Sequence, residues 1–241
     1  MRKSLRVVHT ADVHLGEPAN VFTGAAPDAD ALAFARVIDT VLEEEADALL
    51  IAGDLFDSNR VREPAVRFAE GQLRRLRCPV VLIPGNHDCY DDGSVYRRFD
   101  LRGIGAHVHP LCAADGELRT FDELRLTVWG KGLVEHAPAN RPLDGIPSRG
   151  GEHWFVGLAH GHFIEDRREL RSSLITPDEI AGSGLDYLAL GHVHVFRDVS
   201  QGAVRACYPG APRIPYAPDR GSVAVIRLDP EDGVSIEERR L

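Results

Sequence analysis

Five short apolar segments of this chain each end directly in a group of polar side chains, and this repeated arrangement limits the possible folds more than any other feature. The clearest case is Val80–Pro84, which is followed at once by Gly85-Asn86-His87-Asp88. An apolar run of this length that stops at a Pro-Gly turn is typical of a buried strand. In open sheets of parallel strands, functional groups lie on the loops at the strand ends. The arrangement therefore predicts a site at one edge of a sheet.

The first third of the chain alternates between strand and helix patterns. We expect strands at Leu5–Thr10, Ala48–Ala52 and Val80–Pro84, and helices at Asp28–Glu45 and Glu63–Arg77. Pro27 and Asp28 are start signals for the first helix, in which apolar side chains recur at helical spacing. A strand–helix–strand–helix–strand order predicts a parallel sheet with right-handed crossovers.

The remainder of the chain is richer in strands that pair locally. The pattern predicts strands at Leu124–Trp129, Trp154–Ala159 and Leu185–Leu190, a short helix at Pro177–Ala181, one hairpin from Val195–Val199 and Ala203–Tyr208, and a closing hairpin from Val223–Leu228 and Val234–Glu238. An α/β beginning followed by antiparallel strands implies either a mixed sheet or two sheets packed face to face.

Composition excludes several classes of protein. With 241 residues, 44% of them hydrophobic, the chain is long enough for one large domain with its own core. Its four cysteines are scattered and form no C-x-x-C pair, which disfavours a disulfide framework or a structural zinc site. We find neither a signal-peptide pattern nor an apolar stretch of membrane-spanning length, so we expect a cytoplasmic protein without a membrane partner. The net charge of −9 argues against a broad basic surface, although bound cations would reverse the local sign.

The polar groups at the strand ends are of metal-ligand type. The five motifs are Asp12-Val13-His14, Gly53-Asp54-Leu55-Phe56-Asp57, Gly85-Asn86-His87-Asp88, His160-Gly161-His162 and Gly191-His192-Val193-His194. Each alone carries little information, and we interpret His107-Val108-His109 as surface alternation on a strand end. All five in one chain, each at a strand terminus, indicate a common site.

The donor types decide what such a site can hold. Carboxylate and amide oxygens together with imidazole nitrogens, and no thiolate, suit Mn²⁺, iron or Zn²⁺. The donors suffice for two ions. Two ions roughly 3.5–4 Å apart, joined by a shared carboxylate, form a clamp for in-line displacement at phosphorus.

The ordered set D-x-H, G-D-x-x-D, G-N-H-D, H and G-H-x-H resembles that of the calcineurin-like metallophosphoesterases. The resemblance covers the whole chain and implies an α/β fold of two mixed β-sheets packed face to face and flanked by helices (α/β/β/α), with residues 1–241 as a single catalytic domain. It implies that the first metal is held by Asp12, His14 and His194, with Asp54 bridging. The second metal would take Asp54, Asn86, His160 and His192. Mn²⁺ is the favoured ion, with iron and Zn²⁺ as alternatives.

The resemblance also assigns roles around the metals. His87 would act on the scissile phosphate as general acid or charge stabiliser, and Asp88 would orient it. Gly85 would supply backbone freedom between neighbours that face different targets. His162 competes with His160 for the fourth motif, and we prefer His160 because it directly follows the strand. Asp57 is expected to orient a ligand histidine or cap its loop, and His9 to pack near the site without binding metal.

A narrower resemblance, to the SbcD type of DNA repair nuclease, rests on flanking residues. These are His9–Gly16, Gly53–Asp57, Asp186–His194 and Tyr208-Pro209-Gly210-Ala211-Pro212. It implies a DNA exonuclease acting on single- or double-stranded DNA, and a homodimer through the helix Glu63–Arg77. The chain stops at Leu241, just after the closing hairpin, so we expect no separate capping domain, and the ATPase partner of such nucleases stays open.

Two other functions remain as alternatives. The first is a small-molecule phosphodiesterase or phosphomonoesterase that acts on cyclic nucleotides or nucleotide-type esters, and net acidity favours it. The second is a non-catalytic metal-binding scaffold subunit, which is disfavoured because every ligand position is filled. Several arginines could track a phosphate backbone, but acidic neighbours favour solvated helix faces. They are Arg60, Arg62, Arg67, Arg167, Arg168 and Arg171.

Overall fold

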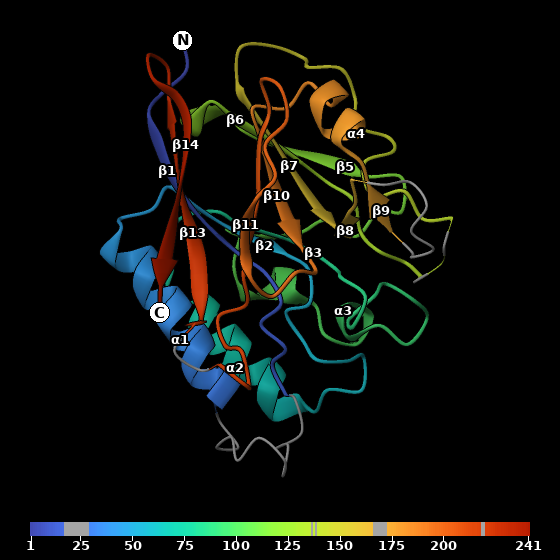
Figure 1. Cartoon of the computed structure of the whole chain (residues 1–241). Coiled ribbons are helices and arrows are strands. Elements are labelled where there is room, and N and C mark those ends of the chain that lie inside the picture. The colour runs from blue at the N-terminus through green and yellow to red at the C-terminus, as the bar shows by residue number, and fades with distance from the viewer. Residues whose placement is uncertain (17–28, 136, 138, 166–172, 218–219) are drawn as a thin grey trace.

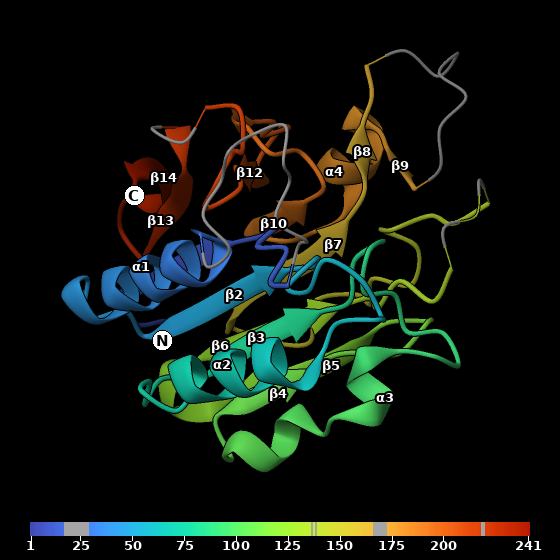
Figure 2. The same ribbon diagram turned by 90° about the horizontal axis from the view of Figure 1, so that it is seen from below.

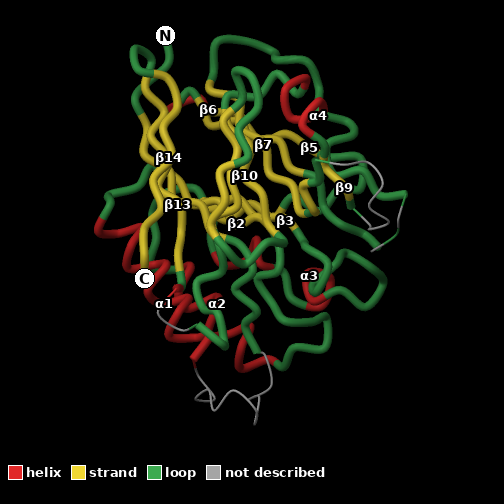
Figure 3. Tube along the Cα trace, in the orientation of Figure 1, coloured by secondary structure: helices red, strands yellow, loops and turns green. Residues whose placement is uncertain are grey.

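The computed structural model describes residues 1–16, 29–135, 137, 139–165, 173–217 and 220–241 (Figure 1). Within these residues, two six-stranded mixed sheets form the centre of the molecule, and the helices lie at its periphery (Figure 3). The predicted arrangement of two mixed sheets flanked by helices is confirmed. Pro27 and Asp28, the expected start signals of the first helix, lie outside the described residues.

The first sheet contains the predicted parallel segment. Its strands are, in spatial order, β14 (Gly233–Arg240), β13 (Ser222–Asp229), β1 (Leu5–Thr10), β2 (Ala48–Ala52), β3 (Val80–Ile83) and β4 (Val108–Pro110). The strands β1 to β4 run parallel, whereas the closing hairpin β13–β14 adds to β1 in antiparallel register, with Val7 opposite Ile226.

The second sheet comes from the later part of the chain. Its order is β11 (Phe196–Asp198), β12 (Arg205–Pro209), β10 (Tyr187–Gly191), β7 (Trp154–His160), β6 (Leu126–Gly130) and β5 (Glu117–Phe121). The four central strands are parallel, and each edge strand pairs in antiparallel fashion. A small parallel pair, β8 (His162–Phe163) and β9 (Leu174–Ile175), extends beyond β7.

Three apolar clusters explain why the layers hold together. The helices α1 (Ala29–Glu43) and α2 (Glu63–Leu73) cover one face of the first sheet, as Figure 2 shows from below. A second cluster fills the space between the two sheets. A third lies on the outer face of the second sheet, against the short helix α4 (Pro177–Gly182). Strands buried on both faces read as continuous apolar runs, which is why β2 and β10 were predictable.

The remaining helical segments are short. They are α3 (Val95–Arg98) and two 3₁₀ turns at Leu101–Ile104 and Asp122–Leu124. Among the described residues, no helix combines the length and the apolar character needed to cross a membrane.

The predicted elements differ from the observed ones in several respects. The helix α2 ends at Leu73 rather than at Arg77, because the backbone N–H groups of Arg75 and Leu76 donate to carbonyls three residues back instead of four. The strands β4, β5, β8 and β9 and the helix α3 were not predicted, and Leu124, expected in a strand, lies in a 3₁₀ turn. β5 is a largely exposed edge strand without an apolar run, so its sequence lacks the periodicity of a buried strand.

Candidate metal centre

The five motifs converge at one edge of the molecule, where the carboxyl ends of parallel strands from both sheets meet. Asp12 and His14 follow β1, Asp54 follows β2, and Asn86 and His87 follow β3 of the first sheet. From the second sheet, His160 is the last residue of β7, and His192 and His194 follow β10. The strands β2 and β7 also pack against each other, which brings the two groups of loops together.

One group of donors contains Asp12, His14 and His194, whose ligand atoms all lie within 4.8 Å of one another. The Nε2 atoms of His14 and His194 are 3.3 Å apart, and the Nε2 atom of His194 is 3.7 Å from Oδ1 of Asp12. These are the three residues expected to hold the first metal. Two imidazole nitrogens turned toward each other beside a carboxylate are the geometry of ligands around a shared cation.

The second group surrounds His160. Its Nε2 atom lies 3.4 Å from Oδ2 of Asp54 and 2.9 Å from Oδ1 of Asn86. The same Asn86 oxygen lies 2.9 Å from Nδ1 of His192. Asp12, Asp54 and His160 also form a cluster within 4.8 Å, so Asp12 belongs to both groups. All seven predicted ligands are therefore brought together.

Four of these seven residues have unusual backbone conformations. Asp12, His14 and Asp54 have φ angles of 54°, 54° and 52°, and His192 has a φ of 109°. Positive φ is uncommon for residues other than glycine, costs free energy, and tends to occur at functional sites.

Two motif glycines are required because there is no space for a side chain. A Cβ atom on Gly85 would lie 2.2 Å from Oδ1 of Asp54, and one on Gly191 would lie 1.9 Å from the carbonyl oxygen of Ala52. Gly85 is not among the residues with positive φ. The expectation that Gly85 supplies backbone freedom is therefore wrong: it lets the β3 loop approach Asp54.

The electrostatics of the site favour a cation between the carboxylates. Burial alone would lower the pKa of His160, but Asp54 and Asp12 raise it to about 9. Burial opposes ionisation of Asp54, yet His160 and the other histidines hold its pKa well below the usual value. Burial raises the pKa of Asp12 to about 6. The two carboxylates thus favour a positive charge in their midst, which a proton on His160 or a bound cation can supply.

The hydrogen bonds around the imidazoles fix which nitrogen faces the site. Nδ1 of His160 donates to the carbonyl oxygen of Ala52 at 2.8 Å, which leaves Nε2 directed at Asn86 and Asp54. Burial lowers the pKa of His14 to about 4, so this ring is neutral at pH 7. Its Nδ1 atom is buried without a hydrogen-bond partner and lies 3.6 Å from Oδ1 of Asp57. The Ala52 carbonyl that holds His160 is the kind of outer partner that sets ligand orientation in metal sites.

His87 lies at the mouth of the site and belongs to neither of the two groups above, but its ring forms a third cluster with His14 and Asp57, whose ligand atoms lie within 4.8 Å of one another. Its side chain is 44% exposed, and its ring contacts that of His14, with centroids 4.5 Å apart. Nδ1 of His87 donates to the carbonyl oxygen of Asp57 at 2.8 Å, so Nε2 is the nitrogen available to a substrate. The backbone N–H of His87 donates to Oδ1 of Asp54 at 2.8 Å.

Asp88 does not orient His87, and this expectation is corrected. Its carboxylate is fully buried and accepts hydrogen bonds from the backbone N–H groups of Gly85 and Phe56 and from the hydroxyl of Tyr96. Asp88 therefore ties the loop after β3 to the loop after β2. Asp57 holds His87 instead, through a backbone carbonyl that no sequence motif could reveal.

The other histidines named in the sequence analysis lie outside the two donor groups. His162 packs its ring on His192 at 5.9 Å but joins neither group of donors, which supports the preference for His160. His9 is buried, with Nδ1 2.7 Å from the hydroxyl of Tyr187. His107 and His109, expected to be surface alternation, lie beside Leu73 and Phe121, apart from the donor groups.

A cavity of about 120 Å³ opens beside the donors. It is lined by Val13, His14, Asp30, Asp57, His87, His194, Arg213 and Pro215. Asp30 and Arg213 form a largely buried ion pair in its wall. Sequence reasoning missed this pair, because its members are 183 residues apart and belong to no motif.

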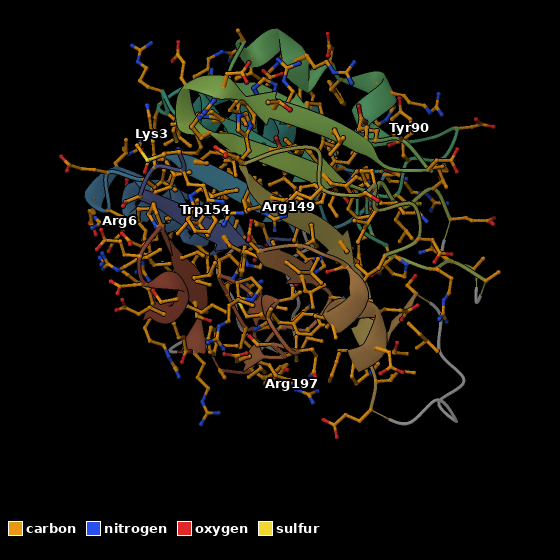
Figure 4. All side chains as sticks on the ribbon, turned by 90° about the horizontal axis from the view of Figure 1, so that it is seen from above. Lys3, Arg6, Tyr90, Arg149, Trp154 and Arg197 are labelled. Atoms are coloured by element: carbon orange, nitrogen blue, oxygen red, sulfur yellow. The ribbon has the colours of Figure 1, made fainter. Side chains whose placement is uncertain are left out.

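A larger cavity, of about 470 Å³, lies at the other end of the second sheet, near Arg149 and His153. Figure 4, seen from above, labels Arg149 and Trp154 at that end. Trp154 begins β7 and His160 ends it, so the two ends are roughly 20 Å apart at the rise of a strand. This cavity contains none of the predicted ligands.

The arginines support the solvated-face interpretation where the structure describes them. Arg67 pairs with Glu63 and Glu70 on the exposed side of α2. Arg60 and Arg62 are exposed. Arg167, Arg168 and Arg171 lie outside the described residues.

The donor set fits a pair of divalent cations. Two buried carboxylates, an amide oxygen and four imidazole nitrogens converge, and each group includes at least one carboxylate. Oxygen and nitrogen donors of this kind suit Mn²⁺, iron or Zn²⁺.

Comparison with known proteins agrees with this geometry. The family model of the calcineurin-like phosphoesterases matches residues 5–196. The chain is 29% identical over 233 residues to the uncharacterized metallophosphoesterase YhaO of Bacillus subtilis, covering 87% of this chain and 53% of YhaO. It is 30% identical over 228 residues to the DNA double-strand break repair protein Mre11 of Methanopyrus kandleri, covering 86% and 49%. The chain thus spans about half the length of these two relatives.

A third relative and two solved structures extend the comparison. The SbcD component of the SbcCD nuclease of Bacillus subtilis is 26% identical over 274 residues, covering 97% of this chain and 69% of that protein. TT1561 of Thermus thermophilus superposes with a TM-score of 0.62 at 12% identity over 99% of both chains. GAP50 of Plasmodium, the anchor in the inner membrane complex, gives 0.55 at 12% identity, over 98% of this chain and 84% of GAP50. These two structures establish the shared fold.

The family match covers most of the chain, and the fold and the donor groups agree with it. The chain belongs to the calcineurin-like phosphoesterases, a family of metal-dependent phosphoric ester hydrolases.

Proposed function

We propose that this chain is a two-metal phosphodiesterase that cleaves nucleic acid, with DNA as the favoured substrate, as a nuclease of SbcD type. The observation that carries the proposal is the shape of the site. A cavity of about 120 Å³ is far smaller than the roughly 300–1,000 Å³ of pockets that enclose a whole small molecule. It admits a phosphate group and leaves the rest of the substrate outside, which suits a polymer.

The assignment of ligands follows the two donor groups. Asp12, His14 and His194 would hold one ion, and Asn86, His160 and His192 the other, with Asp54 between them. Mn²⁺ is the preferred ion in this proposal. Two bound divalent cations would supply positive charge to the phosphate oxygens and lower the pKa of a water molecule. Residues 1–241 would act as one catalytic domain, because both sheets contribute ligands.

His87 is the residue that would serve the leaving group. Its Nδ1–H is held by the carbonyl of Asp57, so a protonated ring would present Nε2–H toward the cavity. An alkoxide leaving group needs a proton, and imidazole is suited to give one near neutral pH. The backbone N–H of His87 stays on Asp54, which couples the position of the acid to that of the bridging ligand.

The relatives support nucleic acid as the substrate. One is a DNA double-strand break repair protein and another is part of a nuclease, and they align with 86% and 97% of this chain. A small-molecule phosphodiesterase or phosphomonoesterase remains the second candidate. The net charge of −9, and the pairing of Arg67 with Glu63 and Glu70, favour it over a long basic track.

A substrate comparison tests the proposal. Single-stranded DNA, a cyclic nucleotide, bis(p-nitrophenyl) phosphate and p-nitrophenyl phosphate would be assayed side by side with Mn²⁺. We expect cleavage of DNA and of the aryl diester, and little of the monoester. Preferential hydrolysis of the cyclic nucleotide or the monoester would replace the nuclease with the second candidate.

An Asp54→Asn variant tests the metal assignment. Because the Asp54 carboxylate would bridge both ions, we expect loss of bound Mn²⁺ and at least a hundredfold loss of diester hydrolysis. His109→Ala, which alters a histidine outside both donor groups, is the matched control and should retain metal and activity. Full metal content in the Asp54 variant would refute the assignment.

A further inference from the structure

Tyr216 is an aromatic side chain left in solvent beside the mouth of the site. It is 81% exposed, the most exposed large hydrophobic side chain among the described residues apart from Met1. The residue before it, Pro215, lines the cavity together with His14, His87 and His194. An isolated exposed side chain is ordinary, but a ring that directly follows a cavity-lining residue is a candidate for contact with the part of a substrate outside the cavity.

The chain presents this ring on a fixed turn. The backbone N–H of Ala217 donates to the carbonyl oxygen of Ile214 at 3.0 Å, which puts Pro215 and Tyr216 at the two central positions. Proline presets the backbone at the first central position of such turns. Ile214 is only 2% exposed and anchors the turn in the core. The ring therefore stands on a hydrogen-bonded turn that is anchored in the core through Ile214.

Two further contacts join this segment to the site. The N–H of Ala211 donates to the carbonyl oxygen of His194 at 3.1 Å. Arg213 pairs with Asp30 of α1 in the wall of the cavity, and both side chains are largely buried. Val195, directly after His194 in the chain, is a second exposed apolar side chain, at 58%. The segment thus combines a buried guanidinium on the cavity side with apolar surface on the solvent side.

The exposed ring matches one part of a nucleotide, because an aromatic ring stacks on a base without regard to its identity. We propose that the turn Ile214–Ala217 is a nucleotide subsite, in which Tyr216 stacks on the base next to the scissile phosphate, while the ion pair of Arg213 with Asp30 holds the segment against α1. The proposal rests on the proposed phosphodiesterase function and narrows its substrate class to esters that carry a base.

Binding of an uncleavable oligonucleotide tests the subsite. The probe is a fluorescein-labelled, eight-nucleotide phosphorothioate oligothymidylate, and its dissociation constant would be measured by anisotropy with the Mn²⁺-loaded protein. From the usual contribution of one stacked base, we expect Tyr216→Ser to weaken binding by a factor of about 5 to 150. Tyr216→Phe keeps the ring and should bind within about twofold of the wild type.

An abasic oligomer of the same length separates stacking from other effects. The wild type and Tyr216→Ser should bind it equally, since there is no base to stack on. Leu118→Ser, a change at an exposed apolar residue on β5, is the matched control and should bind both oligomers as the wild type does. Unchanged binding of oligothymidylate by Tyr216→Ser, or an equal loss for both oligomers, would overturn the subsite.

Hydrolysis of bis(p-nitrophenyl) phosphate by the wild type shows whether a negative result concerns the Tyr216 subsite or the proposed phosphodiesterase function. If the wild type cleaves this diester and Tyr216→Ser binds oligothymidylate normally, the subsite fails and the proposed function stands. If the wild type cleaves no diester under any metal, the proposed function fails, whatever Tyr216 contributes to binding.

Discussion

At the scale of single residues, neighbours in one motif have separate tasks. Asn86 turns its amide oxygen to His160 and His192, His87 faces the cavity mouth, and Asp88 is buried under the loop. Burial raises the pKa of Asp88 to about 6, while the hydrogen bond from Tyr96 opposes that rise. Residues adjacent in the chain therefore face the donor group around His160, the cavity mouth and the buried loop in turn.

Replacing His87 by alanine separates proton transfer from metal binding. The backbone N–H that donates to Asp54 is retained in the variant, so the ligand geometry should persist. We expect normal Mn²⁺ content with kcat for diesters lower by about 10²–10⁴, the usual contribution of a general acid. Metal analysis and steady-state kinetics check this.

His107→Ala is the matched control for that variant. His107 is bonded to the carbonyl of Leu73 and lies outside the donor groups, so its kcat should equal that of the wild type. Unchanged turnover in His87→Ala would remove His87 from the mechanism, and loss of metal would make it a structural residue.

At the scale of elements, the site depends on how closely the loops after β2 and β3 approach each other. Gly85 has no room for a methyl group, because its Cβ would also lie 2.6 Å from the backbone nitrogen of Asp54. By contrast, Gly71 in α2 has no atom within 4 Å of the position its Cβ would take. The two glycines therefore have opposite consequences when changed.

Gly85→Ala should weaken Mn²⁺ binding by at least tenfold, because the clash displaces Asp54 from its position. Gly71→Ala should leave metal binding unchanged and stabilise the protein by about 0.5–1 kcal/mol, since alanine suits a helix better than glycine does. Isothermal titration with Mn²⁺ and urea unfolding provide the two measurements. Equal Mn²⁺ affinity in Gly85→Ala and the wild type would contradict the steric account.

The interior of the sandwich contains a polar residue that should make stability depend on pH. Burial lowers the pKa of His9 to about 3, against 6.5 for an exposed histidine. Below pH 6.5, His9 is protonated in the unfolded chain, whereas in the folded chain it stays neutral down to about pH 3. The contribution of His9 to the free energy of unfolding is thus present in full above pH 6.5 and is lost as the pH falls. The slope of this loss is up to about 1.4 kcal/mol per pH unit.

A His9→Gln variant should flatten that dependence. We expect the difference in unfolding free energy between pH 7 and pH 5 to be smaller in the variant than in the wild type, as measured by urea unfolding at both pH values. Comparing the two proteins cancels the other histidines, which are common to both. Parallel pH profiles would show that His9 does not titrate on unfolding.

At the scale of the whole molecule, local patterns predicted the elements that are buried and periodic. The strands β1, β2, β3, β7 and β10, and the candidate ligands that follow them, could be assigned because apolar runs end in donor residues. Three features could not be assigned from the sequence: the exposed strand β5, the ion pair of Asp30 and Arg213, and the role of the Asp57 carbonyl. Each of these depends on edge pairing, on contacts between distant residues or on a backbone atom, none of which leaves a periodic trace in the sequence.

Because the candidate ligands come from both sheets, metal binding at the proposed centre should stabilise the molecule as a unit. Mn²⁺ at a hundred times its dissociation constant should raise the unfolding free energy by about 2.7 kcal/mol. Hydrogen exchange should slow together at Asp12–Leu15 after β1 and at His160–His162 after β7, since one pair of ions would join these loops. Asp54→Asn should lose both effects, and His109→Ala should keep them. Protection confined to one sheet would show that the two donor groups do not share their cations.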